Sequence, residues 1–511
     1  MPAKTSDATR EALPVVARDG QPDAREGQAG PGRVTDGAVV PTTPGNAGRG
    51  KGPWLKAVQE AVRDQEIGVS LSTPSSVQKL QAALHGKAKQ APDHRFHRLY
   101  DKVYRADVLE HAYHRCKANG GAAGVDDQSF HDIEAYGLSQ WLGELAEELR
   151  NKTYRPQAVR RVYIPKPDGK QRPLGIPTVK DRVAQMAAVL VLEPIFEADL
   201  QPEQYAYRPG RSAHDAIRRV DELLCSGHTQ VVDADLSGYF DSIPHAELLM
   251  CLRRRIVDGT MLHLLKMWLE MTVEETDDRG RRHRTTTNKD TGRGTPQGAP
   301  ISPLLANLYM RRFVLGWKAL GHDSRLRAHI VNYADDFVIC CRGTAQQAMS
   351  MMQGMMQKLR LTVNETKTHI CHLPDEPFDF LGFTFGRYYS PRTGRSHITC
   401  WPSRKRVSRF CAEITEQTAG RFVQLDASDR LARLNRMLVG WRNYFALGAF
   451  WKAFRAVDRH AQRRFRRWLC RKHKVQGPGG NSYPSDYLYK VLGLVGLERT
   501  APRYGAARAK P

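Results

Sequence analysis

The stretch Val331-Asn332-Tyr333-Ala334-Asp335-Asp336-Phe337-Val338-Ile339 decides the fold of this 511-residue chain. Two adjacent carboxylates separate two short apolar runs rich in β-branched and aromatic residues, a pattern that predicts strand, tight turn and strand. Mg²⁺ prefers oxygen ligands and is usually held by one or two carboxylates together with substrate phosphates. Asp also favours turns without any metal. Taken alone, the stretch therefore fits either a metal site or an ordinary hairpin turn.

A second acidic stretch, Val231 to His245, reads VVDADLSGYFDSIPH. Within it Asp235 follows an apolar run, where an unpaired charge is costly, so we expect it to have a cationic partner. Two strands that each bring a carboxylate to one place fit a two-metal site, in which the ions lie about 3.5–4 Å apart and promote in-line phosphoryl transfer. The pair of stretches predicts nucleotidyl transfer.

The composition favours a nucleic-acid partner. The formal net charge is +24, and such an excess promotes association with polyanions. No apolar run approaches the roughly 18 residues that a membrane span requires, so we expect no membrane partner. The nine cysteines contain no CxxC pair, which argues against a disulfide framework and a structural zinc site. We therefore expect a soluble protein of a reducing cytoplasm.

Patterns typical of helices and strands follow one another along the chain. The first 52 residues lack periodicity and are rich in Gly, Pro, Ala, Asp and Arg, which predicts a disordered extension. The glycine-rich tip Gly120–Asp126 fits either a loop that closes over a template or a plain helix-ending loop. Apolar spacing predicts helices over residues 54–67, 76–84, 96–118, 138–149, 246–271 and 345–359, and strands within 231–235, 331–339, 361–368 and 378–385.

The segment Arg160–Pro177 predicts a hairpin with cations on both arms. Lys166, as a point charge, and Arg172, as a planar fork, suit the grip of a triphosphate. Solvated strand charges produce the same pattern. Both interpretations stay open at this point.

Two further loops precede the carboxylate hairpin. The polar segment Glu274–Arg293 is expected to be a loop or hairpin insertion. The turn Gly294–Pro303 leads into an apolar helix. Gln297 is well placed in this turn to recognise a nucleotide or template through its polar side chain. Gly298 has no side chain, so backbone and a nucleotide or template can approach closely.

From about Ser403 the chain becomes helical and basic. One helix face carries Leu434, Leu438, Trp441 and Phe445, which predicts a buried stripe. The run Arg459–Lys474 contains no acidic residue and interleaves aromatic residues with arginines. This pattern is typical of RNA or DNA binding.

In this order, the motifs resemble those of reverse transcriptases of the group II intron type, the intron-encoded maturases. The resemblance covers about Phe96 to Leu497. It rests on the ordered set 166–177, 235–245, 297–303, 333–336 and 381–383. It implies an α+β right-hand polymerase with fingers, a palm built on an antiparallel sheet, and an α-helical thumb or maturase domain that includes residues 440–445.

The resemblance also implies domain boundaries. Residues 1–52 would be the extension, 53–226 the N-terminal helices and fingers, and 227–395 the palm with a basic insertion at 272–293. Residues 396–475 would form the RNA-binding thumb or maturase domain, and 476–511 a short tail. Because no paired cysteines follow, we expect no C-terminal endonuclease domain.

By this resemblance, Asp235 and Asp335 would be the main ligands of two Mg²⁺ ions. Asp336 would be a supporting carboxylate, and the backbone carbonyl of Leu236 would complete the set. Phe240 would exclude the 2′-OH of ribonucleotides, the group that distinguishes RNA from DNA building blocks.

The remaining roles concern substrates. Lys166 and Arg172 would hold the triphosphate of the incoming dNTP, and Gln297 would line the nucleotide and template site. The turn Leu381–Phe383 would support the primer end.

The implied function is that of an RNA-directed DNA polymerase that binds its group II intron RNA, assists splicing and copies RNA into cDNA for intron mobility. Its partners would be intron RNA, an RNA template and a DNA primer or target, within a bacterial cytoplasmic ribonucleoprotein. The alternatives are an RNA-binding splicing chaperone without polymerase turnover, and a host-recruited reverse transcriptase of the CRISPR-linked or retron-like kind. The oligomeric state and the identity of the RNA are left open.

Overall fold

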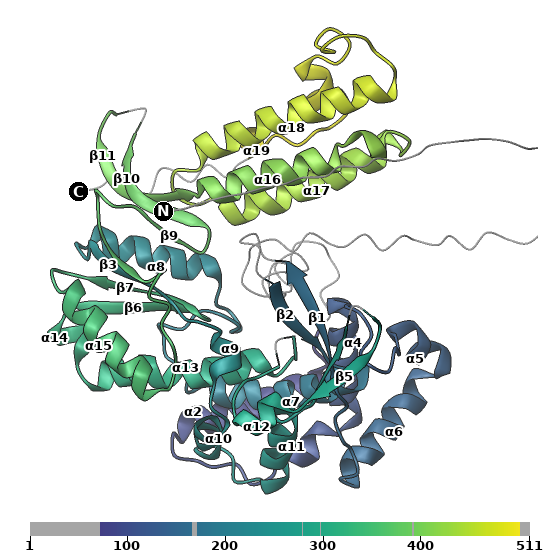
Figure 1. Ribbon diagram of the computed structural model, residues 1–511, viewed down its shortest axis with the longest axis vertical. Helices are drawn as coiled ribbons and strands as arrows, with labels where there is room; N and C mark the ends of the chain where they lie inside the picture. The colour runs from purple at the N-terminus through teal and green to yellow at the C-terminus, as the bar shows by residue number, and fades with distance from the viewer. Residues whose placement is uncertain (1–71, 166–170, 278, 297, 391–392, 501–511) are drawn as a thin grey trace, which may run out of the picture. The chain divides into compact units, whose positions relative to one another are not determined.

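The two acidic stretches lie on adjacent strands of one antiparallel sheet. β6 (Ala328–Tyr333) and β7 (Asp336–Cys341) form the predicted hairpin, and β7 pairs with β3 (Gln230–Asp235). β8 (His369–His372) completes this carboxylate sheet in the order β6-β7-β3-β8 (Figure 1). The computed structural model describes residues 72–165, 171–277, 279–296, 298–390 and 393–500, so the predicted extension and the helix at 54–67 lie outside the described residues.

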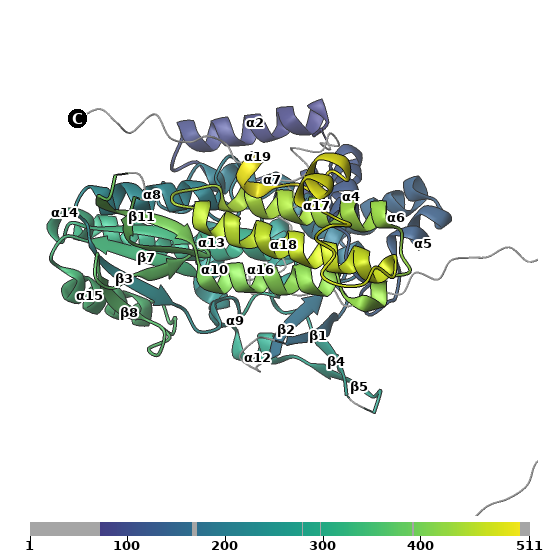
Figure 2. The same ribbon diagram turned by 90° about the horizontal axis from the view of Figure 1, so that it is seen from above.

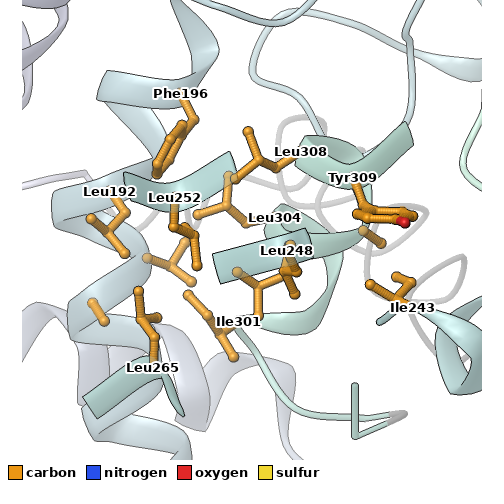
Figure 3. Packing of buried hydrophobic residues seen from close by; sticks show 14 of the residues in the cluster. Leu192, Phe196, Ile243, Leu248, Leu252, Leu265, Ile301, Leu304, Leu308 and Tyr309 are labelled. Carbon is orange, nitrogen blue, oxygen red and sulfur yellow. The ribbon is translucent and has the colours of Figure 1, made fainter. Parts of the chain in front are cut away.

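Each face of the carboxylate sheet covers a different hydrophobic core. The adjacent residues Cys340 and Cys341 on β7 are fully buried and belong to different cores, because successive side chains of a strand point to opposite faces. The first core packs the sheet against α7 (Val179–Glu197), α13 (Ser302–Ala319) and α15 (Ala345–Lys358). Figure 3 draws a part of this core that includes Leu192 and Phe196 of α7 and Leu304 and Leu308 of α13.

Two predicted long helices are each broken in the structure. Residues 96–118 form α3 (Tyr100–Val103) and α4 (Ala106–Asn119), and residues 246–271 form α10 (His245–Arg253) and α11 (Gly259–Leu269). Asp258 accounts for the break between α10 and α11 and for the start of α3. Its carboxylate accepts hydrogen bonds from backbone N–H groups at the start of α3 and of α11, at 2.8–3.1 Å, and so satisfies both helix ends.

The segment around 272–293 joins the sheet of the basic hairpin. β1 (Val159–Pro165) and β2 (Gln171–Ile176) form that hairpin, and β1 pairs in parallel with β4 (Val273–Thr276). β5 (Arg282–Thr285) completes the order β2-β1-β4-β5. The expected hairpin is present, and its pairing with β1 links residues more than a hundred positions apart, which no local pattern reveals.

A third sheet follows the carboxylate sheet in the chain. The single strand predicted over 378–385 is two strands, β9 (Phe378–Phe380) and β10 (Phe383–Tyr389), which β11 (Ser396–Pro402) extends. The strand predicted over 361–368 is wrong. That segment forms turns and one isolated bridge, Leu236 to Val363.

Three long helices after Ser403 lie side by side: α16 (Arg404–Gln417), α17 (Ala427–Phe445) and α18 (Trp451–Lys472) (Figure 2). The predicted stripe on α17 is buried in the second core, together with Phe383 and Phe385 of β10. No helix in the described part of the chain is long and apolar enough to cross a membrane.

The remaining described helices cover the sheets and carry the connections. They are α2 (Ser75–Gln90), α5 (Phe130–Tyr136), α6 (Leu138–Arg150), α8 (Ala213–Cys225), α9 (Tyr239–Ser242), α12 (Thr287–Thr291), α14 (His322–Arg325) and α19 (Leu497–Thr500), with short turns of helix at Gly420–Phe422 and Tyr487–Val491.

Candidate active site

Three Asp residues lie at one end of the carboxylate sheet. Asp235 is the last residue of β3 and faces Asp336, the first residue of β7, directly across the antiparallel ladder. Asp335 precedes it in the tight turn, which Ala334 enters with φ +60°. Like charges placed directly opposite each other destabilise a strand pair. This end of the sheet therefore attracts a cation.

The turn itself is held by the buried side chain of Asn332. Its Nδ2 donates to the carbonyl of Ala334 at 2.8 Å. Asp335 also influences the neighbouring α9. The pKa of Tyr239 lies well above its usual value, mainly through burial, and nearby negative charges, including Asp335, add to the rise.

The cationic partner expected for Asp235 is Lys367. Its Nζ lies 3.0 Å from Oδ2 of Asp235, and Nδ2 of Asn364 donates to the same oxygen at 3.1 Å. The backbone holds the arrangement, because Asn364 N donates to the Asp235 carbonyl at 2.8 Å. Sequence reasoning missed Lys367 and Asn364 because it assigned residues 361–368 to a strand. The polar run Asn364–Thr368 was the available signal.

The donor set suits a hard divalent cation. Asp235, Asp335 and Asp336 offer only carboxylate oxygens, and the ammonium group of Lys367 already provides a positive charge beside one of them. Among the described residues, no group of three or more His, Cys, Asp or Glu is arranged to hold a metal ion. Mg²⁺ is usually bound by only one or two protein carboxylates and takes its other ligands from substrate phosphates and water.

The 235–245 segment is tied to the turn that carries Gln297. Thr295 N donates to the carbonyl of Phe240 at 2.7 Å, and Gly294 N donates to the carbonyl of Ile243 at 2.9 Å. His245 is buried, and its Nε2 lies 2.7 Å from the carbonyl of Gly294. That carbonyl can only accept, so Nε2 carries the proton. Phe240 is 9% exposed, and Gln297 lies outside the described residues.

The same turn meets strand β2. Gly298 has φ +111°, and a Cβ built there would lie 2.4 Å from the carbonyl oxygen of Gly175. The close approach that the structure describes is to β2, and the approach to a nucleotide or template stays a prediction. The basic hairpin and the 294–303 turn are therefore neighbours. Arg172 faces Ile164 in the β1–β2 ladder, and its side chain, like the whole of Lys166, lies outside what the structure describes.

The basic run on α18 divides into two sets of arginines. One set recurs at every fourth position and is exposed: Arg455, Arg459, Arg463, Arg467 and Arg471. Members of the other set bond to the protein itself. Arg464 donates to the carbonyl of Thr415 at 3.1 Å, and Arg466 to the carbonyl of Tyr483 at 2.8 Å.

The exposed set, here called the arginine stripe, borders a shallow hollow of about 470 Å³. This hollow is lined by Cys411, Ala456, Arg459, His460, Gln462, Arg463 and Arg466. Only Arg455 of the stripe forms an ion pair in the described part of the chain, with Glu498 at 2.7 Å. The remaining members keep their charges available for an anionic partner.

Comparison with known proteins matches two family models. Residues 164–385 match the reverse transcriptase (RNA-dependent DNA polymerase) family, and residues 407–482 match the group II intron maturase-specific domain. These ranges contain the carboxylate hairpin and the arginine stripe, respectively.

Individual proteins are also similar to this chain. Protein YkfC of Escherichia coli is 32% identical over 376 residues, which cover 66% of this chain and 96% of that protein. The group II intron-encoded protein LtrA of Lactococcus lactis is 28% identical over 354 residues, 57% of each chain. Among solved structures, a chain of a partial Cas6-RT-Cas1–Cas2 complex overlaps with a TM-score of 0.32 at 20% identity, covering 51% of this chain and 42% of that one.

Proposed function

The chain belongs to the family of reverse transcriptases with a group II intron maturase-specific domain, and from this premise we propose how its residues carry out RNA-directed DNA synthesis. The observation that carries the proposal is the meeting of Asp235 and Asp336 across one ladder, with Asp335 at the adjoining turn. We assign Asp235 and Asp335 as the main ligands of two Mg²⁺ ions. Asp336 acts as a supporting carboxylate, and the carbonyl of Leu236 completes the set.

The chemistry of the site is mainly positioning and charge neutralisation. When bound, the two ions lower the pKa of the primer 3′-OH and neutralise charge on the departing pyrophosphate. The carboxylates of Asp235 and Asp335 hold the reacting groups in line at the end of the sheet. Lys367 balances the charge of Asp235 before substrate arrives, an assignment supported by the 3.0 Å ion pair.

We propose that the substrate contacts come from three segments. Lys166 and Arg172 on the basic hairpin hold the triphosphate of the dNTP, and Gln297 lines the nucleotide and template site. Phe240 excludes ribonucleotides by filling the space that a 2′-OH requires. The backbone bond between Thr295 and Phe240, at 2.7 Å, and the contact between Gly298 and Gly175 support a common pocket for these segments.

We further propose that the RNA partner is a group II intron, whose splicing the protein assists and whose cDNA it makes for mobility, with an RNA template and a DNA primer as the other partners. The matched maturase-specific domain contains the arginine stripe, whose rise of about 6 Å for every four residues suits repeated contacts with a phosphate backbone. We also propose that it acts in a bacterial cytoplasmic ribonucleoprotein, in line with its relatives in Escherichia coli and Lactococcus lactis.

In domain terms, we assign the fingers to residues 53–226 and the palm to 227–395. The thumb or maturase domain occupies 396–475, and residues 1–52 and 476–511 are terminal extensions. The basic insertion at 272–293 acts with the fingers, because its strand β4 pairs with β1.

Primer extension tests the proposed reaction. Purified protein is given an RNA template, a DNA primer, dNTPs and Mg²⁺, beside an Asp335→Asn variant. We expect DNA synthesis by the unmodified protein only, with RNA affinity equal in both. RNA binding without synthesis by the unmodified protein would contradict the polymerase proposal and favour a splicing chaperone. The same assay with ribonucleotides tests Phe240→Ala, which we expect to incorporate them.

A further inference from the structure

The turn between β9 and β10 has an unfavourable backbone conformation. Leu381 has φ +50°, although it is not glycine, and Gly382 follows with φ +86°. Side chains other than glycine rarely adopt such angles, and residues held in them depend on their surroundings. A Cβ at Gly382 would lie 3.0 Å from Nε of Arg406 on α16. Neighbouring elements therefore fix the shape of this turn.

Tyr444 of α17 provides the hydrogen bond that holds the turn. Its hydroxyl donates to the carbonyl of Leu381 at 2.8 Å, and its ring lies 5.9 Å from that of Phe383. Burial raises the pKa of Tyr444, and nearby Tyr333 adds to the rise. The hydroxyl thus stays protonated and remains a donor. Tyr333 belongs to the carboxylate hairpin and to the second core, against which Tyr444 packs.

The position of Tyr444 is itself fixed by α8. Nε2 of His214 lies 2.7 Å from the main-chain carbonyl of Tyr444, and the two rings are 5.4 Å apart. A carbonyl can only accept, so Nε2 carries the proton. Burial also lowers the pKa of His214, which keeps the ring neutral. Figure 1 shows the β9-β10-β11 sheet against the end of the layer formed by α16, α17 and α18.

We propose that Tyr444 is a positioning residue of the polymerase: its hydroxyl fixes the Leu381–Gly382 turn, and through it the primer 3′ end, relative to the carboxylate hairpin. The inference rests on the proposed function, since it takes the turn as the primer support. Tyr444 touches neither primer nor nucleotide. It acts through the carbonyl of Leu381, so its loss alters the rate of incorporation more than the affinity for dNTP.

Single-turnover primer extension tests this inference with Tyr444→Phe, which removes only the hydroxyl. The expected result is a fall of roughly threefold to tenfold in the maximal incorporation rate, the range given by one net hydrogen bond. The dNTP concentration at half-maximal rate and the affinity for template RNA stay the same. A merely structural role would lower the melting temperature without this split between rate and affinity.

Tyr100→Phe is the matched control. The hydroxyl of Tyr100 also donates to a main-chain carbonyl, that of Leu149 at 2.7 Å, but it lies among the N-terminal helices. We expect the Tyr100→Phe variant to lose stability comparable to that lost by Tyr444→Phe. Its incorporation rate should stay that of the unmodified protein. Equal incorporation rates for the Tyr444 and Tyr100 variants would overturn the inference. Primer extension by the unmodified protein in the same assay would leave the proposed function intact.

Gly382→Ala tests the turn directly, because the added Cβ is strained and meets Arg406. We expect a lower incorporation rate, with an effect that is less than additive with Tyr444→Phe because both changes act on one turn. A normal rate for Gly382→Ala, or fully additive effects, would also overturn the inference.

Discussion

Asp235 has a carboxylate opposite it and an ammonium group beside it. The repulsion from Asp336 across the ladder is balanced by Lys367 at 3.0 Å. A bound divalent cation would provide the same balance. The stability contributed by Lys367 should therefore depend on the metal in solution.

We predict that Lys367→Ala lowers the melting temperature in metal-free buffer by about 1–2 °C, the effect of a largely exposed ion pair. Added Mg²⁺ should raise the melting temperature more in the variant than in the unmodified protein, because it replaces the missing charge. Differential scanning calorimetry across a Mg²⁺ titration measures both values.

Lys490→Ala is the control for this titration. Lys490 is similarly exposed (67%, against 63% for Lys367) and pairs with Asp486 at 2.9 Å, away from the carboxylate sheet. Its variant should respond to Mg²⁺ as the unmodified protein does. The same response from the Lys367 variant would exclude the proposed link between Lys367 and the metal.

Asp181 is a second residue with an unusual environment. It is buried on α7, and Tyr154 and Thr178 donate to its carboxylate at 2.5 and 2.8 Å. Burial raises its pKa from 3.8 to about 6 despite these bonds. The folded state then binds a proton that the unfolded state has lost, so this residue stabilises the protein at low pH and its contribution falls as the pH rises from about 4 to 6.

We predict that Asp181→Asn removes this dependence. Between pH 4.5 and 7.5 the free energy of unfolding of the unmodified protein should fall by about 2 kcal/mol relative to that of the variant. This figure follows from roughly 1.4 kcal/mol for each pH unit below the raised pKa. Urea denaturation at the two pH values measures the difference. Parallel pH profiles for the two proteins would show that Asp181 is ionised in the folded state at both pH values.

At the scale of elements, the arginines of α18 have two roles: some bond to neighbouring segments and others face solvent. The buried face of this helix, which includes Phe454, Phe465 and Trp468, closes the second core. Arg464 and Arg466 bond to neighbouring segments, while the arginine stripe faces solvent. In the sequence all of these arginines except Arg455 belong to the acid-free run Arg459–Lys474, and that pattern does not separate the two sets.

We predict that Arg463→Ala with Arg467→Ala weakens RNA binding and reduces the salt dependence. The slope of log K against log salt should fall by about two, close to one for each lost phosphate contact. The pair Arg464→Ala and Arg466→Ala should instead lower the melting temperature and keep the slope. Filter binding at several salt concentrations distinguishes the two pairs of substitutions. An equal loss of slope in both would refute the division of the α18 arginines into an exposed set and a set bonded to the protein.

At the scale of the whole molecule, the carboxylate sheet is a partition between two cores. One core joins it to the N-terminal helices, and the other joins it to β9, β10 and the helices after Ser403. Cys340 lies in the second core and Cys341 in the first, so the reactivity of each thiol measures the opening of one core. Both thiols are fully buried, and burial raises the pKa of each, that of Cys341 to about 12. They therefore react only when the structure opens.

We predict that each core opens separately. Leu438→Ala, in the second core, should accelerate alkylation of Cys340 at least tenfold more than that of Cys341, since such a truncation costs about 2–5 kcal/mol. Leu265→Ala, in the first core, should favour Cys341 instead. Mass spectrometry of the labelled peptides measures the two rates. Equal acceleration of both thiols would mean that the molecule opens as one cooperative unit.

The sequence by itself determined the features whose causes are local. The alternation around Asp335 and Asp336 specifies the hairpin, and the apolar spacing on α17 specifies its buried stripe. The strand patterns on either side of residues 167–169 predict the pairing of β1 with β2. Each of these depends on neighbours within a few residues, so a pattern of side chains predicts it, and the ordered motifs identify the family.

Only the tertiary structure decided which distant residues meet. Lys367 reaches Asp235, Tyr444 reaches Leu381, and β1 pairs with β4. The break between α10 and α11 also depends on a distant contact, because the Asp258 carboxylate that caps α11 also accepts hydrogen bonds from the start of α3. Such contacts depend on how the sheets and helices pack together, and the free energy of that packing is shared among all the buried side chains, so no short stretch of sequence contains it.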